Sequence, residues 1–256
     1  MLLEGKKAAV FNVANKWSIA WAIAQAFARE GADLVLGYQN ERLGEKVRAL
    51  VPELPREPVL VELDVATDEA VERAAGQVRE QVGELDVLVH SLAYAPSEAL
   101  ERPFIETSRD AFRTALEVST YSLILLARAF RPILRPGASI LALTYYASEK
   151  VVPNYNVMAV AKAGLETSVR YLAWELGEAG IRVNAISAGP LNTLAARGIS
   201  GFTGMLQIHR EKAPLKRNIE HREVGDAAVF LASPLSSGIT GEVLYVDAGY
   251  NIMGLA

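Results

Sequence analysis

The chain has 256 residues, three histidines, no cysteine and a formal net charge of −4. Without cysteine it can form no disulfide or thiolate metal site, and the scattered histidines indicate neither a metal cluster nor a Ser-His-Asp triad, so no metal site is expected. The acidic balance argues against general nucleic-acid binding.

No segment looks like a membrane span or a secretion signal. No apolar run approaches the roughly 20 residues that a membrane-spanning helix needs. The N-terminal run M-L-L-E-G-K-K-A-A-V lacks a charged leader followed by an apolar stretch and a cleavage site. We therefore expect a soluble protein of the cytoplasm that does not bind membranes.

Short β-rich runs alternate with helical patterns along the whole chain. Predicted strands cover 6–11, 33–38, 58–63, 86–91, 138–144, 181–187 and 242–247, and predicted helices cover 18–30, 41–51, 67–82, 108–131, 154–177 and 221–232. Most strands are nearly continuous apolar runs, which is typical of parallel strands covered on both faces. The order predicts a single doubly wound, Rossmann-type α/β domain over residues 1–256, with about seven parallel strands and helices on both faces.

Several helix ends have recognisable signals. Ser18, Thr67 and Ser108 are expected N-caps, Gly31 ends the first helix, and either Gly177 or Gly180 ends the fifth.

The first strand is followed by F-N-V-A-N-K-W-S-I-A, and no glycine occurs between Gly5 and Gly31. The glycine fingerprint of dinucleotide-binding folds is therefore absent. A tight turn into a helix N-terminus still offers N–H groups and a positive dipole end to a pyrophosphate. Ser18 can add a hydroxyl there or serve as an ordinary N-cap, and Asn12 is a residue type that tolerates positive φ.

The second and third strands end in residues suited to an adenosine. Gln39 and Glu41 follow the second strand, and the first cation beyond them is Arg42. Because a ribose 2′-phosphate needs positive charge at this corner, the sequence favours NADH over NADPH. Asp64 and Val65 end the third strand and can bracket the adenine, although Asp64 can equally be only a turn residue.

Two long connections, 92–107 and 189–215, both follow strands and therefore lie on the ligand side of the sheet. Loops longer than about 12–15 residues are usually functional in a compact domain. We interpret 189–215 as a substrate flap, because it follows a strand end and carries Gly198, Gly201 and Gly204; the alternative is an amphipathic helix packed permanently on the body. Its base carries Arg197, Arg210, Lys212, Lys216, Arg217 and Arg222 against Glu211 and Glu220.

Tyr155 and Lys162 are the most informative pair in the chain. They are seven residues apart in a predicted helix, so two turns of about 3.6 residues place both side chains on one face. An ammonium beside a phenol favours the phenolate and lowers the tyrosine pKa. The pair can therefore be a proton donor and its activating cation, or only a boundary tyrosine and a lysine extending to solvent.

The chain resembles the bacterial NADH-dependent enoyl-acyl carrier protein reductases of the FabI type, a divergent branch of the short-chain dehydrogenase/reductases. The resemblance spans the chain and includes W-S-I-A-W-A-I-A, Y-Q-N-E-R-L, H-S-L-A-Y-A-P, N-Y-N-V-M-A-V-A-K and R-V-N-A-I-S-A-G-P-L-N-T. Ordinary members of the superfamily have Tyr-x3-Lys and a serine about 13 residues before the tyrosine. Here Met158 and Ala142 stand at those places, which is similar to the enoyl reductases.

The resemblance implies roles for individual residues. Tyr155 binds the thioester carbonyl oxygen, Lys162 holds the nicotinamide ribose, and Tyr145 is a second tyrosine of the site. The positions that match cofactor contacts are Asn12, Ser18, Ile19, Gln39, Asp64, Val65, Ser91, Leu92, Ala93, Lys162, Leu191 and Thr193. Those that match the acyl pocket and flap are Tyr94, Ala95, Tyr145, Tyr155, Met158, Pro190, Ala195, Ala196, Ile199, Phe202 and Met205.

The implied activity is hydride transfer from NADH to the β-carbon of trans-2-enoyl thioesters, the last reductive step of type II fatty acid elongation. The implied partners are an acyl carrier protein, which the basic flap base can receive, and further copies of the chain in a homotetramer. Asn12, Ala93 and Ala248 stand where the family usually has glycine. The first puts close approach of the backbone to the cofactor in question, and the other two should need only local adjustment.

Two other functions compete with this one. A ketone or alcohol dehydrogenase of the same superfamily would need the serine and the Tyr-x3-Lys spacing that the chain lacks. A non-catalytic dinucleotide-binding protein is favoured by Asn12 but opposed by Tyr145, Tyr155 and Lys162.

Overall fold

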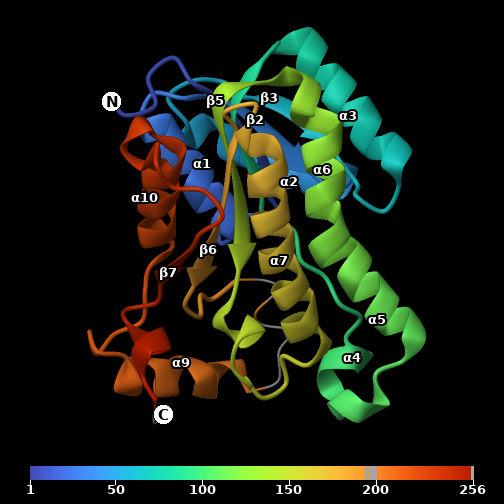
Figure 1. Ribbon diagram of the computed structural model, residues 1–256, viewed down its shortest axis with the longest axis vertical. Coiled ribbons are helices and arrows are strands. Elements are labelled where there is room, and N and C mark those ends of the chain that lie inside the picture. Colours follow the sequence, from blue (N-terminus) through green and yellow to red (C-terminus); the bar gives the residue numbers. More distant parts are fainter. Residues whose placement is uncertain (194–195, 197–200, 255–256) are drawn as a thin grey trace.

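The computed structural model describes residues 1–193, 196 and 201–254. Within them, seven parallel strands form one sheet in the order β3-β2-β1-β4-β5-β6-β7 (Figure 1). The strands are β1 (Lys7–Phe11), β2 (Asp33–Tyr38), β3 (Val59–Glu62), β4 (Leu85–His90), β5 (Leu134–Thr144), β6 (Arg182–Ala188) and β7 (Val243–Val246). The predicted doubly wound α/β fold is confirmed, and only β5 begins clearly earlier than the sequence pattern indicates.

Helices connect the strands. They are α1 (Ile19–Arg29), α2 (Glu41–Leu50), α3 (Asp68–Gln81), α4 (Glu98–Glu101), α5 (Arg109–Leu116), α6 (Ser122–Phe130), α7 (Val157–Gly177), α9 (Phe202–Lys212) and α10 (His221–Ala232). The three predicted N-caps are confirmed, because the side chains of Ser18, Thr67 and Ser108 each accept a hydrogen bond from a backbone N–H in the first turn.

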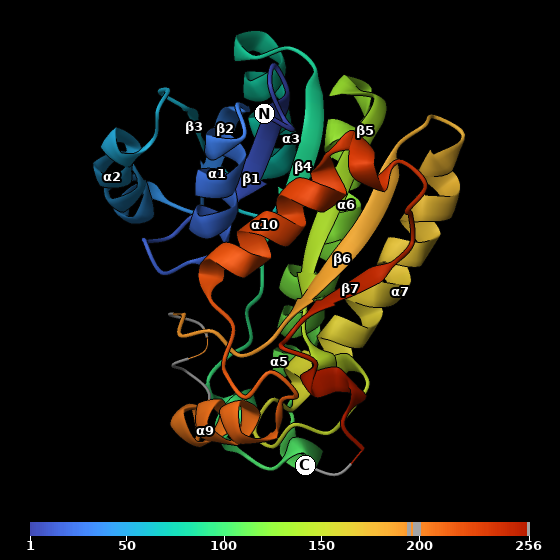
Figure 2. The ribbon, with the colours of Figure 1, turned by 90° about the vertical axis from the view of Figure 1, so that its left-hand side faces the viewer.

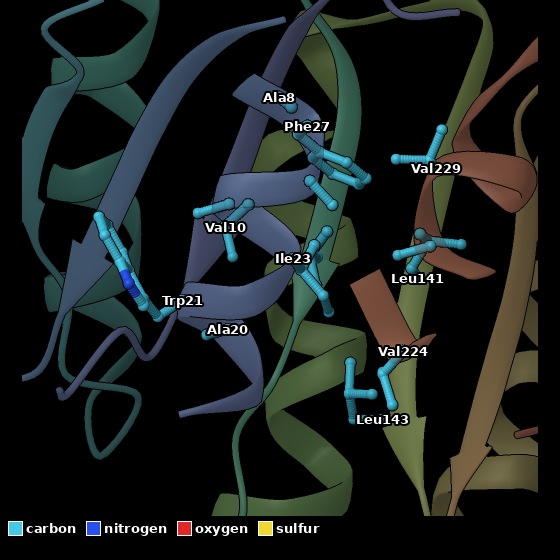
Figure 3. Close-up of a cluster of buried hydrophobic side chains, with 14 of the residues drawn as sticks. Ala8, Val10, Ala20, Trp21, Ile23, Phe27, Leu141, Leu143, Val224 and Val229 are labelled. Carbon is cyan, nitrogen blue, oxygen red and sulfur yellow. The ribbon is translucent and has the colours of Figure 1, made fainter. Parts of the chain in front are cut away.

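The core lies on both faces of the sheet. Helices α1 and α10 cover one face, where Trp21, Ile23 and Phe27 of α1 belong to one buried cluster with Val10 of β1 and Leu141 of β5 (Figures 2 and 3). Helices α3, α6 and α7 cover the other face. Gly225 permits the close crossing of α10 over α1, because a Cβ there would lie 2.8 Å from the carbonyl oxygen of Ala22. Continuous apolar strands are therefore buried on both sides, as their sequences predict.

Two predicted helices differ in ways that affect the site. The pattern over 108–131 is divided by a π-helical turn, Glu117–Tyr121, between α5 and α6. The pattern over 154–177 becomes helical only at Val157, because Asn156 has φ 44° and ψ −124°. Tyr155 therefore lies in the turn before α7, and its place relative to Lys162 is not set by helical periodicity.

Both long connections contain short helices. The segment 92–107 includes α4, and α9 forms much of 189–215. In Figure 1 the strand arrowheads of β5 and β6 point to the lower end of the molecule, where α4 and α9 lie. The C-terminal edge of the sheet is therefore the edge at which these connections gather. In the described part of the chain, no helix is long and apolar enough to cross a membrane.

Candidate active site

The strand order reverses between β1 and β4, which places a ligand crevice outside their C-terminal ends. Asn12 directly follows β1 and has φ 70°, the left-handed conformation that glycine commonly supplies. Its Nδ2 donates to the carbonyl oxygen of Ser91, just after β4, at 2.8 Å. The side chain thus ties the two strand ends together, and the asparagine keeps the backbone conformation that a glycine would allow.

The N-terminus of α1 lies beside this crevice. Ser18 Oγ accepts from the N–H of Trp21 at 3.3 Å and donates to the carbonyl oxygen of Asn15 at 2.7 Å, so its role as N-cap is confirmed. The N–H groups of Ile19 and Ala20 have no acceptor inside the helix. These free donors and the positive end of the helix dipole suit a pyrophosphate.

The corner after β2 carries one cation outside an ion pair. Gln39 is exposed, Asn40 caps α2, and Glu41 is ion-paired with Arg48, whereas the exposed Arg42 makes no ion pair within the described residues. The preference for NADH at this corner therefore stays a prediction from the sequence. Asp64 Oδ1 accepts from the N–H of Ala66 at 3.1 Å, which is the turn role that the sequence allows; a contact with adenine stays a prediction.

Two predicted tyrosines meet after β5 and before α7. The rings of Tyr145 and Tyr155 are 5.0 Å apart between centroids, at 56°. The Tyr145 hydroxyl donates to Met205 Sδ at 3.3 Å, which joins α9 to the pair. Tyr146 points elsewhere, to Tyr245 and Tyr250, because β5 has ended at Thr144 and Tyr146 begins a 3-10 turn. Residues predicted for catalysis and for the flap are therefore in direct contact.

The expected lowering of the Tyr155 pKa by Lys162 is wrong for this structure. Tyr155 is 9% exposed, and burial, followed by the neighbouring Tyr145, raises its pKa above the ordinary value. Within the described residues the two side chains make no hydrogen bond to each other. The physical reason is that Tyr155 precedes the helix, so desolvation of the phenolate outweighs any effect of the ammonium.

Lys162 is held beneath the strand ends. It is 4% exposed, and its Nζ donates to the carbonyl oxygen of Leu143 at 2.7 Å. Burial lowers the pKa of Lys162 to about 8, and the carboxylate of Glu166 opposes that shift. Glu166 is itself buried and accepts from the Thr144 hydroxyl at 2.6 Å. An ammonium with one protein acceptor retains donors for a ligand hydroxyl.

His90 ends β4 and is fully buried beside this lysine. Its Nε2 lies 2.7 Å from Ser122 Oγ, which donates its own hydrogen to the carbonyl oxygen of Val118, so Nε2 carries the imidazole proton. Burial and then the charge of Lys162 lower the His90 pKa to about 3. The histidine is therefore neutral.

The other residues predicted for the acyl pocket and the cofactor differ in their exposure. Tyr94 is 55% exposed and Ala95 is partly buried, whereas Met158 and Phe202 are buried. Pro190 and Leu191 are also buried after β6, and Thr193 Oγ1 accepts from the N–H of Ala196 at 3.1 Å. Ile19, Ala93 and Leu92 follow β1 and β4, and Val65 packs in the core. The predicted residues Ala195 and Ile199, with Arg197, lie outside the described residues.

Ala248 needs more than the local adjustment expected for one methyl. It has φ 56°, between Asp247 and Gly249, in the left-handed region that costs an ordinary residue about 1–2 kcal/mol. The Asp247 carboxylate accepts from the N–H groups of Gly249 and Asn251, which holds the strained turn. Ala93 does not adopt a positive φ.

Sequence reasoning missed three residues that organise this region. Ser119, in the π-helical turn, bonds the backbone of Tyr94; Glu166 faces Lys162; and His209 of α9 stacks on Tyr250 at 4.8 Å. The hydroxyl-rich run V-S-T-Y-S inside an apolar helix was the available signal for Ser119.

Comparisons with known proteins agree with the geometry. A family model described as enoyl-(acyl carrier protein) reductase matches residues 13–251. The enoyl-[acyl-carrier-protein] reductase [NADH] FabI of Rickettsia typhi is 48% identical over 253 residues, covering 99% of this chain and 97% of the relative. The protein of the same name from Synechocystis sp. is 49% identical over 257 residues, covering 99% of both chains.

Solved structures are similar over the whole chain. The NADH enoyl-[acyl-carrier-protein] reductase of Aquifex aeolicus has a TM-score of 0.96 at 45% identity and covers 100% of both chains. The Bacillus cereus enoyl-acyl carrier protein reductase, solved with NADP+ and indole naphthyridinone, has a TM-score of 0.97 at 46% identity and covers 99% of both. With this site at the C-terminal edge of its sheet, the chain belongs to the enoyl-acyl carrier protein reductase family.

Proposed function

We propose that Tyr155, Tyr145 and Lys162 form the reducing centre of this protein, which is an NADH-dependent enoyl-acyl carrier protein reductase of fatty acid synthesis. The observation that carries the assignment is the contact of Tyr145 with both Tyr155 and Met205, because it joins the predicted catalytic and flap residues at one place. When bound, NADH supplies a hydride to the β-carbon of the enoyl thioester.

Tyr155 donates a hydrogen bond to the thioester carbonyl oxygen, where negative charge develops during the reaction. A donor set in place there is worth a few kcal/mol. Burial raises the Tyr155 pKa, so the phenol keeps its proton at neutral pH and can act as that donor. Tyr145 packs against the Tyr155 ring and limits its movement. The two tyrosines and Met158 exclude water from the carbonyl.

The residues that surround the crevice suit a dinucleotide. Free N–H groups at the start of α1 would hold the pyrophosphate, and Gln39 with Asp64 would bind the adenosine. Lys162 would hold the nicotinamide ribose hydroxyls with the donors that Leu143 leaves free. The remaining predicted cofactor and pocket residues keep the roles that the family resemblance implies, in one domain over residues 1–256 with a flap at about 189–215.

NADH consumption by the purified protein tests this function. Crotonyl thioester should be reduced with NADH, whereas acetoacetyl thioester and NADPH should support little turnover. Reduction of acetoacetyl thioester instead would indicate the ketone reductase. Binding of NADH without turnover on any thioester would indicate the non-catalytic protein and would direct attention to Asn12.

We propose that the exposed cations of α9 and the segment after it receive the acidic acyl carrier protein. Arg210 and Lys212 make no ion pair within the described residues, and Lys216 only donates to the carbonyl oxygen of Glu211. Arg217 contributes less than its sequence position indicates, because Glu223 holds its guanidinium through two bonds of 2.7 and 2.8 Å. Free cations on the flap and just after it can steer an acidic partner.

The double variant Arg210→Glu/Lys212→Glu should raise KM for a carrier-bound enoyl substrate by about 10-fold and leave KM for a short enoyl thioester unchanged. Steady-state kinetics with both substrates measure the difference. The matched control, Arg73→Glu/Arg79→Glu, makes the same charge change on exposed positions of α3. An equal rise for both double variants would show that net charge alone acts and would exclude docking at α9.

We propose that the protein forms a homotetramer and that it works in the cytoplasm. Large apolar side chains are exposed on neighbouring helices: Tyr121 just before α6, Ile124 on α6, and Tyr171 and Trp174 on α7. Tyr121 and Ile124 also line a surface hollow of about 400 Å³ that includes none of the predicted site residues. Such patches are typical of protein interfaces. A monomeric mass by light scattering would contradict the assembly; the location rests on NADH being an intracellular metabolite.

A further inference from the structure

The π-helical turn Glu117–Tyr121 and Ser122, the first residue of α6, direct three hydroxyls to three different parts of the site. Ser119 bonds the backbone of Tyr94, Thr120 Oγ1 donates to the carbonyl oxygen of Ala161 at 2.7 Å, and Ser122, next in the chain, bonds His90. π-Helical turns are rare and occur frequently at functional sites, because the extra residue re-aims side chains. The turn therefore connects the loop after β4, the helix that carries Lys162 and the end of β4.

Ser119 makes the most specific of these contacts. Its Oγ accepts from the N–H of Tyr94 at 2.9 Å and donates to the carbonyl oxygen of the same residue at 3.1 Å. The serine is fully buried. Since the hydroxyl has one hydrogen, its 3.7 Å approach to Met158 Sδ is a packing contact once the carbonyl is bonded. One atom thus satisfies both backbone polar groups of Tyr94.

This double contact fixes a loop that has few other restraints. Asn12 holds the loop at Ser91, where β4 has just ended. Tyr94 lies in the loop between Ser91 and the short helix α4. Among the described residues, Ser119 is the one whose side chain bonds the Tyr94 backbone. The Tyr94 ring itself is more than half exposed. The position of Tyr94 and Ala95 therefore depends on the hydroxyl of Ser119 more than on burial of their side chains.

We infer that Ser119 is a positioning residue for the acyl pocket: its hydroxyl fixes the backbone of Tyr94 against Met158 and thereby sets the wall that receives the enoyl chain, without touching substrate or cofactor. The inference rests on the proposed assignment of Tyr94, Ala95 and Met158 to that pocket. A buried N–H and C=O left without partners would instead favour local opening of the loop.

The test compares Ser119→Ala with Ser119→Thr, which retains the hydroxyl. A matched control is Ser168→Ala, which also removes a helical hydroxyl bonded to a backbone carbonyl, that of Gly164 at 2.9 Å. In Ser119→Ala, exchange of the Tyr94 amide hydrogen should accelerate by about 10-fold or more, and KM for crotonyl thioester should rise by about 10-fold. The kcat should stay within about 3-fold of the parent and NADH affinity should not change. Ser119→Thr should restore both readouts at least in part, and Ser168→Ala should resemble the parent.

The two readouts separate this inference from the proposed function. Unchanged exchange of the Tyr94 amide in Ser119→Ala would show that the Ser119 hydroxyl does not hold the Tyr94 backbone, whatever the kinetics show. Faster exchange with an unchanged KM would confirm that the hydroxyl holds the backbone but would overturn its role in the acyl pocket. A parallel loss of NADH affinity would also overturn the inference, because it would indicate general damage. If Ser119→Ala does not fold, Ser119→Cys, which is similar in size but a weaker donor and acceptor, gives the same comparison.

Discussion

Replacing Tyr155 with phenylalanine is expected to lower kcat about 100-fold or more while leaving the fold intact. The variant removes the donor that faces the developing charge and keeps the ring that packs on Tyr145. The Tyr155 hydroxyl makes no hydrogen bond within the described residues, so its loss should change the free energy of unfolding little. Single-turnover kinetics with NADH and crotonyl thioester measure the chemical step directly.

Tyr146→Phe is the matched control for this variant. Tyr146 is one residue from Tyr145 but contacts Tyr245 and Tyr250, so turnover should be close to that of the parent. A Tyr155→Phe enzyme that turns over at the parental rate would remove Tyr155 from the mechanism. Because its pKa is raised, deprotonation of Tyr155 should not limit activity near neutral pH.

Replacing Lys162 with methionine should weaken NADH binding by about 10- to 100-fold, because the ribose hydroxyls lose a charged donor. Fluorescence titration with NADH measures the change. In the parent, NADH affinity should fall as pH rises through about 8, where the free protein loses the Lys162 proton. This alkaline loss should be absent from Lys162→Met. Unchanged NADH affinity in the variant would contradict the ribose role.

The same variant should be more stable than the parent at neutral pH. A lysine whose pKa falls from 10.5 to about 8 on folding is less favourably protonated in the folded state, so its charge opposes folding below pH 8. The penalty decreases as pH rises from about 8 to 10.5. Methionine removes this penalty but also loses the bond to Leu143 and the ammonium that faces the buried Glu166 carboxylate, so the net gain in denaturant unfolding should be at most on the order of 1 kcal/mol. Weaker NADH binding together with higher stability would indicate that the lysine is kept for function at a cost in stability. A destabilised variant would instead indicate a structural role.

Residue patterns alone were enough to predict most of the local elements and the family. Apolar runs such as D-L-V-L-G-Y formed buried parallel strands, because their pattern suits burial on both faces. Ser18, Thr67 and Ser108 began helices, because a side-chain oxygen can bond the free N–H groups of the first turn. The match of N-Y-N-V-M-A-V-A-K and the neighbouring motifs was sufficient to identify the enoyl reductases.

The assembly of the site depends on contacts that form only when distant segments pack together. The periodicity that placed Tyr155 and Lys162 on one helical face did not account for the positive φ of Asn156, which ends the helix before Tyr155. The bonds from Ser119 to Tyr94, from Tyr145 to Met205 and from Arg217 to Glu223 were likewise not predicted. Sequence patterns report local conformation and the buried face of each element, whereas the environment of a side chain depends on segments that meet only when the elements pack.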